Sequence, residues 1–145
     1  MNAECGHPAP AASLADAVFA ELAHALARLA ETGEETVIDL RSLPFGPTDL
    51  EALAEKLGDG EVTCALEVAG RSEVRETGFA GVWWVRHFGA GDEIAAEEVH
   101  VTRIPEILVS HPDDVAFAAR RIADAVAASP QNEPTAADEE DMSRG

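Results

Sequence analysis

The chain has 145 residues, 46% of them apolar, and a formal charge of −18 from 10 basic and 28 acidic residues. This length suffices for one domain without a disulfide or metal staple, and the negative charge disfavours nucleic acid and anionic membrane surfaces as partners. No apolar run approaches the roughly 20 residues that span a bilayer, and the first residues lack a secretory signal pattern. With Cys5 and Cys64 as the only cysteines, we expect a cytoplasmic protein that does not insert into the membrane.

The two ends of the chain are rich in small residues, proline and polar residues. Residues 1–12 show no apolar periodicity, and residues 129–145 are acidic and interrupted by proline. Such segments cannot bury enough apolar surface to fold. We therefore expect a disordered arm over 1–12, a single domain over 13–128 and a disordered acidic tail over 129–145.

The first half of the domain carries two helical patterns and a short strand. Apolar residues at helical spacing predict a helix over 14–31, which Ser13 caps and Gly33 ends. The β-branched run at 36–40 predicts a strand. Thr48 and Glu51 have the spacing of a capping box and predict a second helix that ends before residue 58.

From residue 62 to residue 104 the apolar period changes to two. Four runs, at 62–68, 71–79, 81–88 and 93–104, are separated by turns that contain glycine. The first run places Val62, Cys64, Leu66 and Val68 on one face, where we expect Val62 to belong to the core and Cys64 to be a small buried hydrophobic residue. Sequential strands joined by short turns predict an antiparallel meander that ends at Pro105.

A last helix is predicted from Pro112, a residue that suits the first turn of a helix. Its expected buried stripe consists of Val115, Ala119, Ile122 and Val126. The order of elements predicts an α+β fold. We expect a four-stranded antiparallel meander plus a short extra strand, with three helices packed mainly on one face.

Both tryptophans stand side by side in the third strand run. Because neighbouring side chains of a strand point to opposite faces, one should enter the core under the helices and the other should emerge on the opposite face. A terminal segment, a second copy of the chain or a partner would cover it there. Tryptophan and arginine are enriched at interface hot spots, although self-burial and cross-strand ion pairs are the plainer explanation. The candidate partner-binding residues are Trp83, Trp84, Arg86, Arg75, Arg41, Phe45 and Glu76.

Metal ligation and catalysis have weaker support. Cys5 and His7 are two residues apart, but structural zinc sites normally use four ligands at paired spacings. His87 and His100 lie on consecutive strands, and Cys64 lies on an earlier one, so these three are only weak candidates for a metal. No phosphate-binding, nucleophile or zinc-protease motif occurs. We therefore expect neither a cofactor nor enzymatic activity.

Four motifs in one ordered series resemble the HupH/HyaF family of hydrogenase expression and formation proteins. They are IDLRSLPF (38–45), LGDGEV (57–62), SEVRETGFAGVWWVRH (72–87) and VTRIPEIL (101–108). The resemblance covers residues 37–108 and extends more loosely through HPDDVAFAARRI.

The resemblance implies an accessory chaperone for maturation of an uptake nickel–iron hydrogenase. Its expected client is the iron–sulfur small-subunit precursor before twin-arginine export, and other maturation proteins or a second copy of the chain are further expected partners. The alternative is a carrier of metal or of an iron–sulfur cluster for the same hydrogenase. A twin-arginine signal has a basic start and an apolar middle, which an acidic protein with an aromatic sheet face could bind. Such binding should weaken with salt and with Trp83→Ala or Trp84→Ala.

Overall fold

The computed structural model describes residues 13–67 and 69–130. The predicted disordered arm, all of the acidic tail after residue 130, and the Cys5–His7 pair lie outside them. The chain divides into two compact units, Met1–Pro105 and Glu106–Gly145, and each is described by itself.

Helix α2 (Leu14–Thr32) begins and ends as the sequence predicts. Ser13 Oγ accepts a hydrogen bond from the Asp16 backbone N–H at 3.1 Å, and the Asp16 carboxylate accepts one from the Ser13 N–H at 3.2 Å. Gly33 ends the helix with a φ of 81° and donates its N–H to the Leu29 carbonyl at 2.9 Å. A positive φ of this size favours glycine.

Helix α3 (Pro47–Leu57) begins one residue earlier than its predicted cap. Its N-cap is Gly46, and the Asp49 carboxylate accepts the Gly46 N–H at 3.0 Å. The predicted capping box between Thr48 and Glu51 is therefore wrong. Pro47 supplies the physical reason, because its fixed φ suits the first helical position and its missing N–H needs no partner there.

In the described part of the first unit, five strands form one antiparallel sheet in the order β1-β5-β4-β3-β2. The predicted α+β class, the four-stranded meander and the extra strand are confirmed. The strands are β1 (Thr36–Asp39), β2 (Thr63–Glu67), β3 (Arg71–Glu76), β4 (Val82–Phe88) and β5 (Ile94–Val101). The meander forms from consecutive strands, and β1 adds to the free side of β5.

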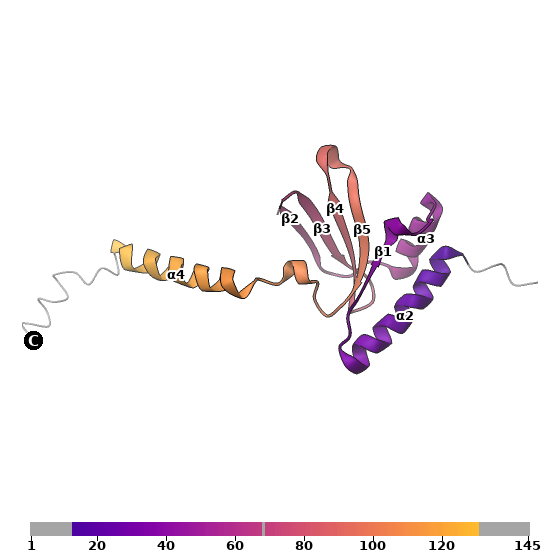
Figure 1. Cartoon of the computed structure of the whole chain (residues 1–145), viewed down its shortest axis with the longest axis horizontal. Coiled ribbons are helices and arrows are strands. Elements are labelled where there is room, and N and C mark those ends of the chain that lie inside the picture. Colours follow the sequence, from indigo (N-terminus) through magenta and orange to yellow (C-terminus); the bar gives the residue numbers. More distant parts are fainter. Residues whose placement is uncertain (1–12, 68, 131–145) are drawn as a thin grey trace, which may run out of the picture. The chain divides into compact units, whose positions relative to one another are not determined.

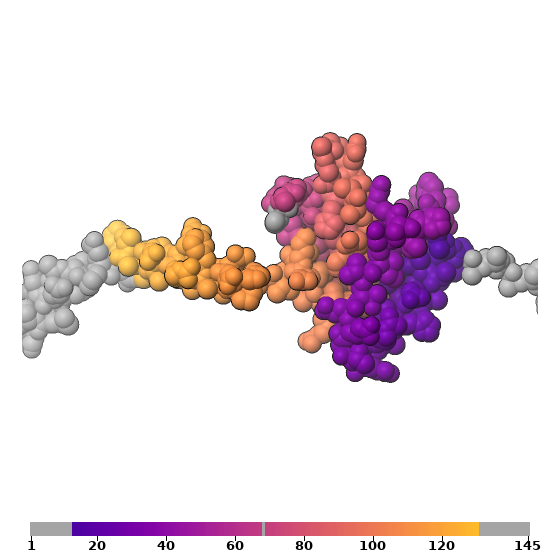
Figure 2. Space-filling model, viewed as in Figure 1, coloured from indigo at the N-terminus to yellow at the C-terminus, as the bar shows by residue number. Residues whose placement is uncertain are grey.

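The register assigns the two tryptophans to opposite faces. Trp84 lies between Arg75 of β3 and Val99 of β5, whereas Trp83 lies between Glu76 and His100. Helices α2 and α3 lie on one side of the sheet (Figure 1), and their side chains fill the layer beside the strands in the space-filling view (Figure 2). Trp84 belongs to the core between these layers, which also contains Val18, Leu22, Leu40, Leu53, Leu57, Val82, Val99 and Val101.

The ends of several predicted strands differ from the structure, and β3 ends at Glu76, three residues before the end of its predicted run. Strand β5 ends at Val101, three residues early, and Thr102 and Pro105 are buried in the segment that follows. Val62 lies before β2 and is 41% exposed, so its predicted place in the core is wrong. Cys64 and Leu66, which were predicted to share the face of Val62, are half-buried. Val68 lies outside the described residues.

The second unit contains helix α4 (Pro112–Ala128), which the Nδ1 atom of His111 caps by accepting the Asp113 N–H at 3.0 Å. The helix is present as predicted, but its apolar stripe is not buried. Val115 is 54% exposed, Ile122 66% and Val126 47%. Apart from α4, the described part of this unit holds only a short turn of helix, Glu106–Leu108, and so offers no second layer for packing.

Candidate functional site

Trp84 is part of a buried polar group at the centre of the sheet. Its indole Nε1–H donates to Glu97 Oε2 at 2.7 Å, and Arg86 Nε donates to the same oxygen at 2.7 Å. Glu97 is only 4% exposed, and a buried carboxylate is tolerated when charged and polar donors satisfy it. The guanidinium groups of Arg75 and Arg86 lie 6.0 and 5.9 Å from the Trp84 ring centroid. Trp84 therefore has a structural role.

Trp83, on the opposite face, is also buried, at 6% exposure. Its indole Nε1–H donates to the carbonyl oxygen of Thr102 at 3.1 Å, in the segment that leaves β5. The two tryptophans lie on opposite faces of the sheet, as expected, but the expectation that one of them emerges from the fold is wrong. Neither ring is exposed, so neither offers a ready contact surface.

The arginines of the strands pair with acidic neighbours on the helix-facing side of the sheet. Arg75 lies 3.8 Å from Asp59, and Arg86 lies 4.0 Å from Glu73 in addition to its contact with Glu97. Ion pairs of this kind contribute little when they are partly exposed. These contacts favour the plainer explanation for both arginines.

Two other predicted binding residues come together beside Glu97. Arg41 and Phe45 line a hollow of about 240 Å³, whose remaining walls are Leu40, Leu43, Leu50 and Glu97. Arg41 belongs to the short helical turn after β1, and Phe45 lies in the loop that leads to α3. The structure thus joins these two residues to the Trp84 group but leaves Glu76 elsewhere.

The weak metal candidates do not assemble into a site. His87 and His100 share the face of Trp83, and Glu98 lies between them, with its Oε1 3.9 Å and 2.8 Å from their Nε2 atoms. The Nδ1 atom of His87 lies 2.8 Å from Ser72 Oγ. Cys64, on β2, is a half-buried free thiol outside this group. Within residues 13–67 and 69–130, no three His, Cys, Asp or Glu side chains are placed to hold a metal ion.

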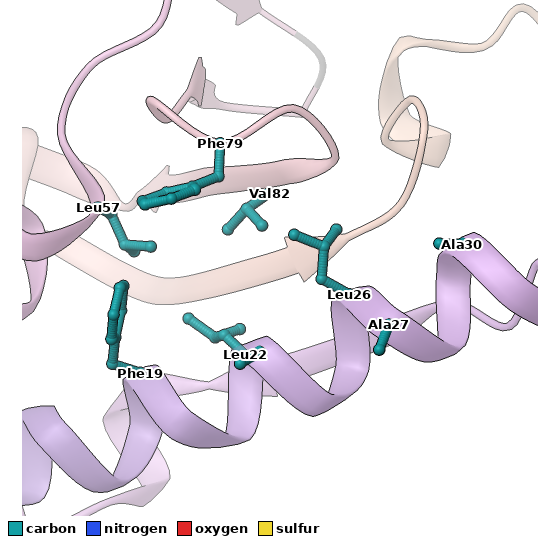
Figure 3. Close-up of a pocket in the computed structure, with 9 residues that line it drawn as sticks. Phe19, Leu22, Leu26, Ala27, Ala30, Leu57, Phe79 and Val82 are labelled. Carbon is teal, nitrogen blue, oxygen red and sulfur yellow. The ribbon is translucent and has the colours of Figure 1, made fainter.

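An open apolar groove runs between α2 and the turn that precedes β4. Its volume is about 410 Å³. Figure 3 shows α2 side chains forming one wall, with Phe79 and Val82 opposite them and Leu57 at one end. The lining side chains are all apolar: Phe19, Leu22, Ala23, Leu26, Ala27, Ala30, Leu57, Phe79 and Val82.

Two phenylalanines mark one end of this groove. Phe79 is 43% exposed, and its ring meets the Phe19 ring edge to face, with centroids 5.9 Å apart and planes at 65°. Lys56 Nζ lies 5.6 Å from the Phe19 centroid and 2.9 Å from Asp16 Oδ1. The Lys56 ammonium, helped by hydrogen bonds from Ser13, lowers the pKa of Asp16 below its ordinary value. The end of the groove therefore carries the Lys56–Asp16 ion pair beside the two phenylalanine rings.

A second hollow of about 660 Å³ continues the groove along α2. It shares Leu26 and Ala30 with the first, and its more polar wall includes Glu76 and Arg103. Gly81 makes the close approach of the turn to α2 possible. A Cβ atom at Gly81 would lie 3.0 Å from Leu26 Cδ1, and the Gly81 φ of 93° favours glycine independently.

The sequence does not indicate the groove, because Phe19 has the helical spacing of an ordinary apolar residue of the helix and only Phe79 stands outside the apolar periods. Phe19 follows Val18 of the buried helical stripe, and Phe79 lies in the turn between two strands. A large aromatic in a turn is the one local signal that could have indicated the site. The pairing of Phe19 with Phe79 is a tertiary contact between segments 60 residues apart.

The sequence model of one protein family matches residues 13–129, and its description is HupH hydrogenase expression protein, C-terminal conserved region. A solved structure described as hydrogenase expression protein HupH from Thiobacillus denitrificans ATCC 25259 is 41% identical. The likeness covers 78% of this chain and 94% of that one, with a TM-score of 0.72.

Curated relatives carry related names. Hydrogenase expression/formation protein HoxQ of Azotobacter vinelandii is 34% identical over 107 residues, which are 72% of this chain and 38% of that protein. Hydrogenase expression/formation protein HupH of Rhodobacter capsulatus is 31% identical over 90 residues, 62% of this chain and 33% of that protein. The chain thus matches between 33% and 38% of the length of these relatives. In the described part of the chain, no helix is long and apolar enough to cross a membrane.

Proposed function

This chain belongs to the HupH family of hydrogenase expression proteins, and we propose that it is a non-enzymatic chaperone in the maturation of an uptake nickel–iron hydrogenase. Its client in this proposal is the iron–sulfur small-subunit precursor, bound before twin-arginine export. The relatives are named for hydrogenase expression and formation, which supports the general role. The choice of client goes further and depends on the chemistry of the groove.

The observation that carries the proposal is the open apolar groove along α2. Chaperones hold apolar segments that have no partner yet, and a hydrophobic groove commonly receives the apolar face of a helical segment. An apolar segment, such as the middle of a twin-arginine signal, matches the chemistry of walls made only of Leu, Ala, Val and Phe side chains. The exposed Phe79 ring would form one side of the contact.

The charge of the chain supports the same client. A net charge of −18 attracts the basic start of a twin-arginine signal and raises the rate of encounter. The apolar segment would then enter the groove, where contact depends on buried area and not on salt. We therefore expect salt to slow association more than it speeds dissociation.

The groove replaces the tryptophan face as the proposed contact. Because Trp83 and Trp84 are 6% and 3% exposed, their replacement by alanine would damage the fold, and any loss of binding would not identify the binding surface. Phe79 is a better probe, since it is partly exposed and stands in a turn.

The test is a titration of the full chain against a fluorescent peptide that carries the basic and apolar parts of a small-subunit twin-arginine signal. Phe79→Ala should weaken binding about tenfold, since a buried aromatic anchor contributes roughly 1–2 kcal/mol or more to binding. Phe117→Ala is the matched control. Phe117 is a phenylalanine on α4 with 55% exposure, and its removal should leave the affinity unchanged.

Two results would count against the proposal. Equal affinities for the wild-type chain and Phe79→Ala would remove the groove as the contact. Recovery of the large subunit, and not the small one, from cells that express both would replace the client. The carrier alternative lacks a ligand set among the described residues, and a stoichiometric content of nickel, iron or zinc in the purified protein would be needed to restore it.

A further inference from the structure

Glu97 has one carboxylate oxygen that the fold leaves without a donor. The side chain is 5% exposed, and Trp84 Nε1 and Arg86 Nε both donate to its Oε2 atom, at 2.7 Å each. No described residue donates to Oε1. Because the described residues contain no buried side-chain oxygen without a hydrogen-bond partner, Oε1 is open to the surface. The opening is the hollow that Glu97 lines together with Leu40, Arg41, Leu43, Phe45 and Leu50, which we call the Glu97 hollow.

The ion pairs that include Glu97 contain one more acid than base. Arg86 lies 2.7 Å from Glu97 and 4.0 Å from Glu73. Arg71 lies 3.8 Å from Glu73 and 3.5 Å from Asp92. Three carboxylates therefore share two guanidinium groups, which leaves this connected group with a net charge of −1. A carboxylate that is largely removed from water gains most from a further cationic N–H donor.

The walls of the Glu97 hollow suit the stem of a long basic side chain. Three leucines supply apolar surface, and Phe45 supplies an aromatic ring. Lysine and arginine bury their methylene stems along apolar surface and place the charged group at the end. The planar guanidinium of arginine also stacks on aromatic rings. The hollow therefore favours arginine over lysine.

The size of the Glu97 hollow limits its occupant to one side chain. Its volume is about 240 Å³, below the roughly 300–1,000 Å³ of pockets for cofactors and other small molecules. Arg41 is the exposed member of the lining and makes no ion pair with a described residue. Its N–H donors are therefore available to the main-chain carbonyl groups on either side of an inserted residue.

From this arrangement we propose that the Glu97 hollow binds one arginine side chain of a partner protein. The arginine guanidinium donates to Glu97 Oε1, its stem lies along the leucines, and Arg41 donates to carbonyl groups of the partner's main chain. The site is separate from the apolar groove along α2, because the two share no lining residue. It therefore does not depend on the client that we propose for the groove.

A titration of the full chain with N-acetyl-arginine N-methylamide, followed by two-dimensional nitrogen–proton NMR, tests the site. This probe carries the arginine side chain, a carbonyl group on each side of it and no other charge. The indole N–H signal of Trp84 should shift, because this group donates to the other oxygen of the Glu97 carboxylate. The indole N–H signal of Trp83 should not move, because it donates to the Thr102 carbonyl and its ring lies on the opposite face. The spectrum of Trp83→Phe identifies the two signals.

The citrulline form of the probe is the matched control for charge. Its side chain has the same length and a neutral end, so it should bind at least about tenfold more weakly, since hydrogen bonds between charged groups are the stronger ones. The lysine form should bind with an affinity between those of the other two. The aspartate form should leave both indole signals in place, because the Glu97 carboxylate repels it.

Leu43→Phe tests the Glu97 hollow without removing a charge. Leu43 is half-buried, and the larger side chain should fill the hollow and weaken arginine binding about tenfold. Leu66→Phe makes the same change at a half-buried leucine on the opposite face of the sheet, so it should leave the affinity unchanged. Arg41→Gln should weaken binding about threefold, because donors to the main-chain carbonyls are lost. The two indole signals of each variant show that the first unit remains folded.

Several results would overturn the proposal. A Trp84 indole signal that does not respond to the arginine probe, or equal affinities for the arginine and citrulline forms, would exclude binding at Glu97 Oε1. An unchanged affinity in Leu43→Phe would place the binding outside the hollow. Tighter binding by Arg41→Gln would show that Arg41 repels the ligand, contrary to its proposed part. Phe79→Ala should leave the affinity for the arginine probe unchanged, so this site and the groove can be refuted separately.

Discussion

Replacing Trp84 by phenylalanine should destabilise the first unit more than the same replacement at Trp83. Both changes remove the same atoms from a buried ring, since Trp83 and Trp84 are 6% and 3% exposed. The cavity and transfer costs should therefore be similar, about 1–2 kcal/mol each. What differs is the hydrogen bond that each indole loses.

The difference can be estimated from the partners of the two indoles. Trp84 donates to the buried carboxylate of Glu97 at 2.7 Å, whereas Trp83 donates to the neutral carbonyl of Thr102 at 3.1 Å. A hydrogen bond to a charged group contributes about 1.5–3 kcal/mol and one between neutral groups about 0.5–1.5 kcal/mol. Trp84→Phe should therefore cost roughly 1 kcal/mol more than Trp83→Phe, because Arg86 alone then satisfies the buried oxygen.

Urea unfolding followed by tryptophan fluorescence measures both variants. Both tryptophans lie on β4, so the one that remains reports only on the first unit. The midpoint should fall further for Trp84→Phe while the slope with denaturant stays constant. In a Glu97→Gln background the extra cost should shrink, since the charged partner is gone. Equal losses for the two variants, or an unchanged difference in that background, would refute the role of the carboxylate.

Two further changes probe the first unit. Gly81→Ala should lower the free energy of unfolding by about 1–3 kcal/mol more than Gly91→Ala does in the same assay. Both residues have a positive φ, but only at Gly81 would a Cβ atom lie near 3.0 Å from Leu26. Equal losses of free energy would mean that the turn can move away from α2. Lys56→Gln should raise the pKa of Asp16, which the Lys56 ammonium holds below its ordinary value of 3.8. Because this pKa is lowered in the folded chain, the stabilising contact is present above pH 3.8 and is lost as the pH falls through the lowered value. Carboxyl titration by NMR measures the shift, and identical pKa values in the two chains would remove Lys56 as its cause.

Local features of the sequence predict most elements of the first unit. The cap of α2 at Ser13 and the end of this helix at Gly33 depend on interactions within one or two turns, so the neighbouring residues predict them. The placement of Trp83 and Trp84 on opposite faces follows from the geometry of any strand. The start of α3 was mispredicted because Thr48 and Glu51 have the spacing of a capping box, whereas Pro47 takes the first helical position, Gly46 is the N-cap and Asp49 accepts the Gly46 N–H.

The sequence by itself determined the α+β class, the meander, the resemblance to a hydrogenase expression family and the placement of the two tryptophans on opposite faces. Only the tertiary structure decided what covers those faces. The Thr102 carbonyl accepts a hydrogen bond from the Trp83 indole, and the Glu97 carboxylate accepts one from the Trp84 indole. The Phe19 and Phe79 rings make contact at one end of the groove. The physical reason is that periodicity is set by backbone geometry over a few residues, whereas burial is set by segments distant in the chain. A pattern of apolar residues therefore shows which side chains share a face, and the folded chain shows which of those faces remains open to a partner.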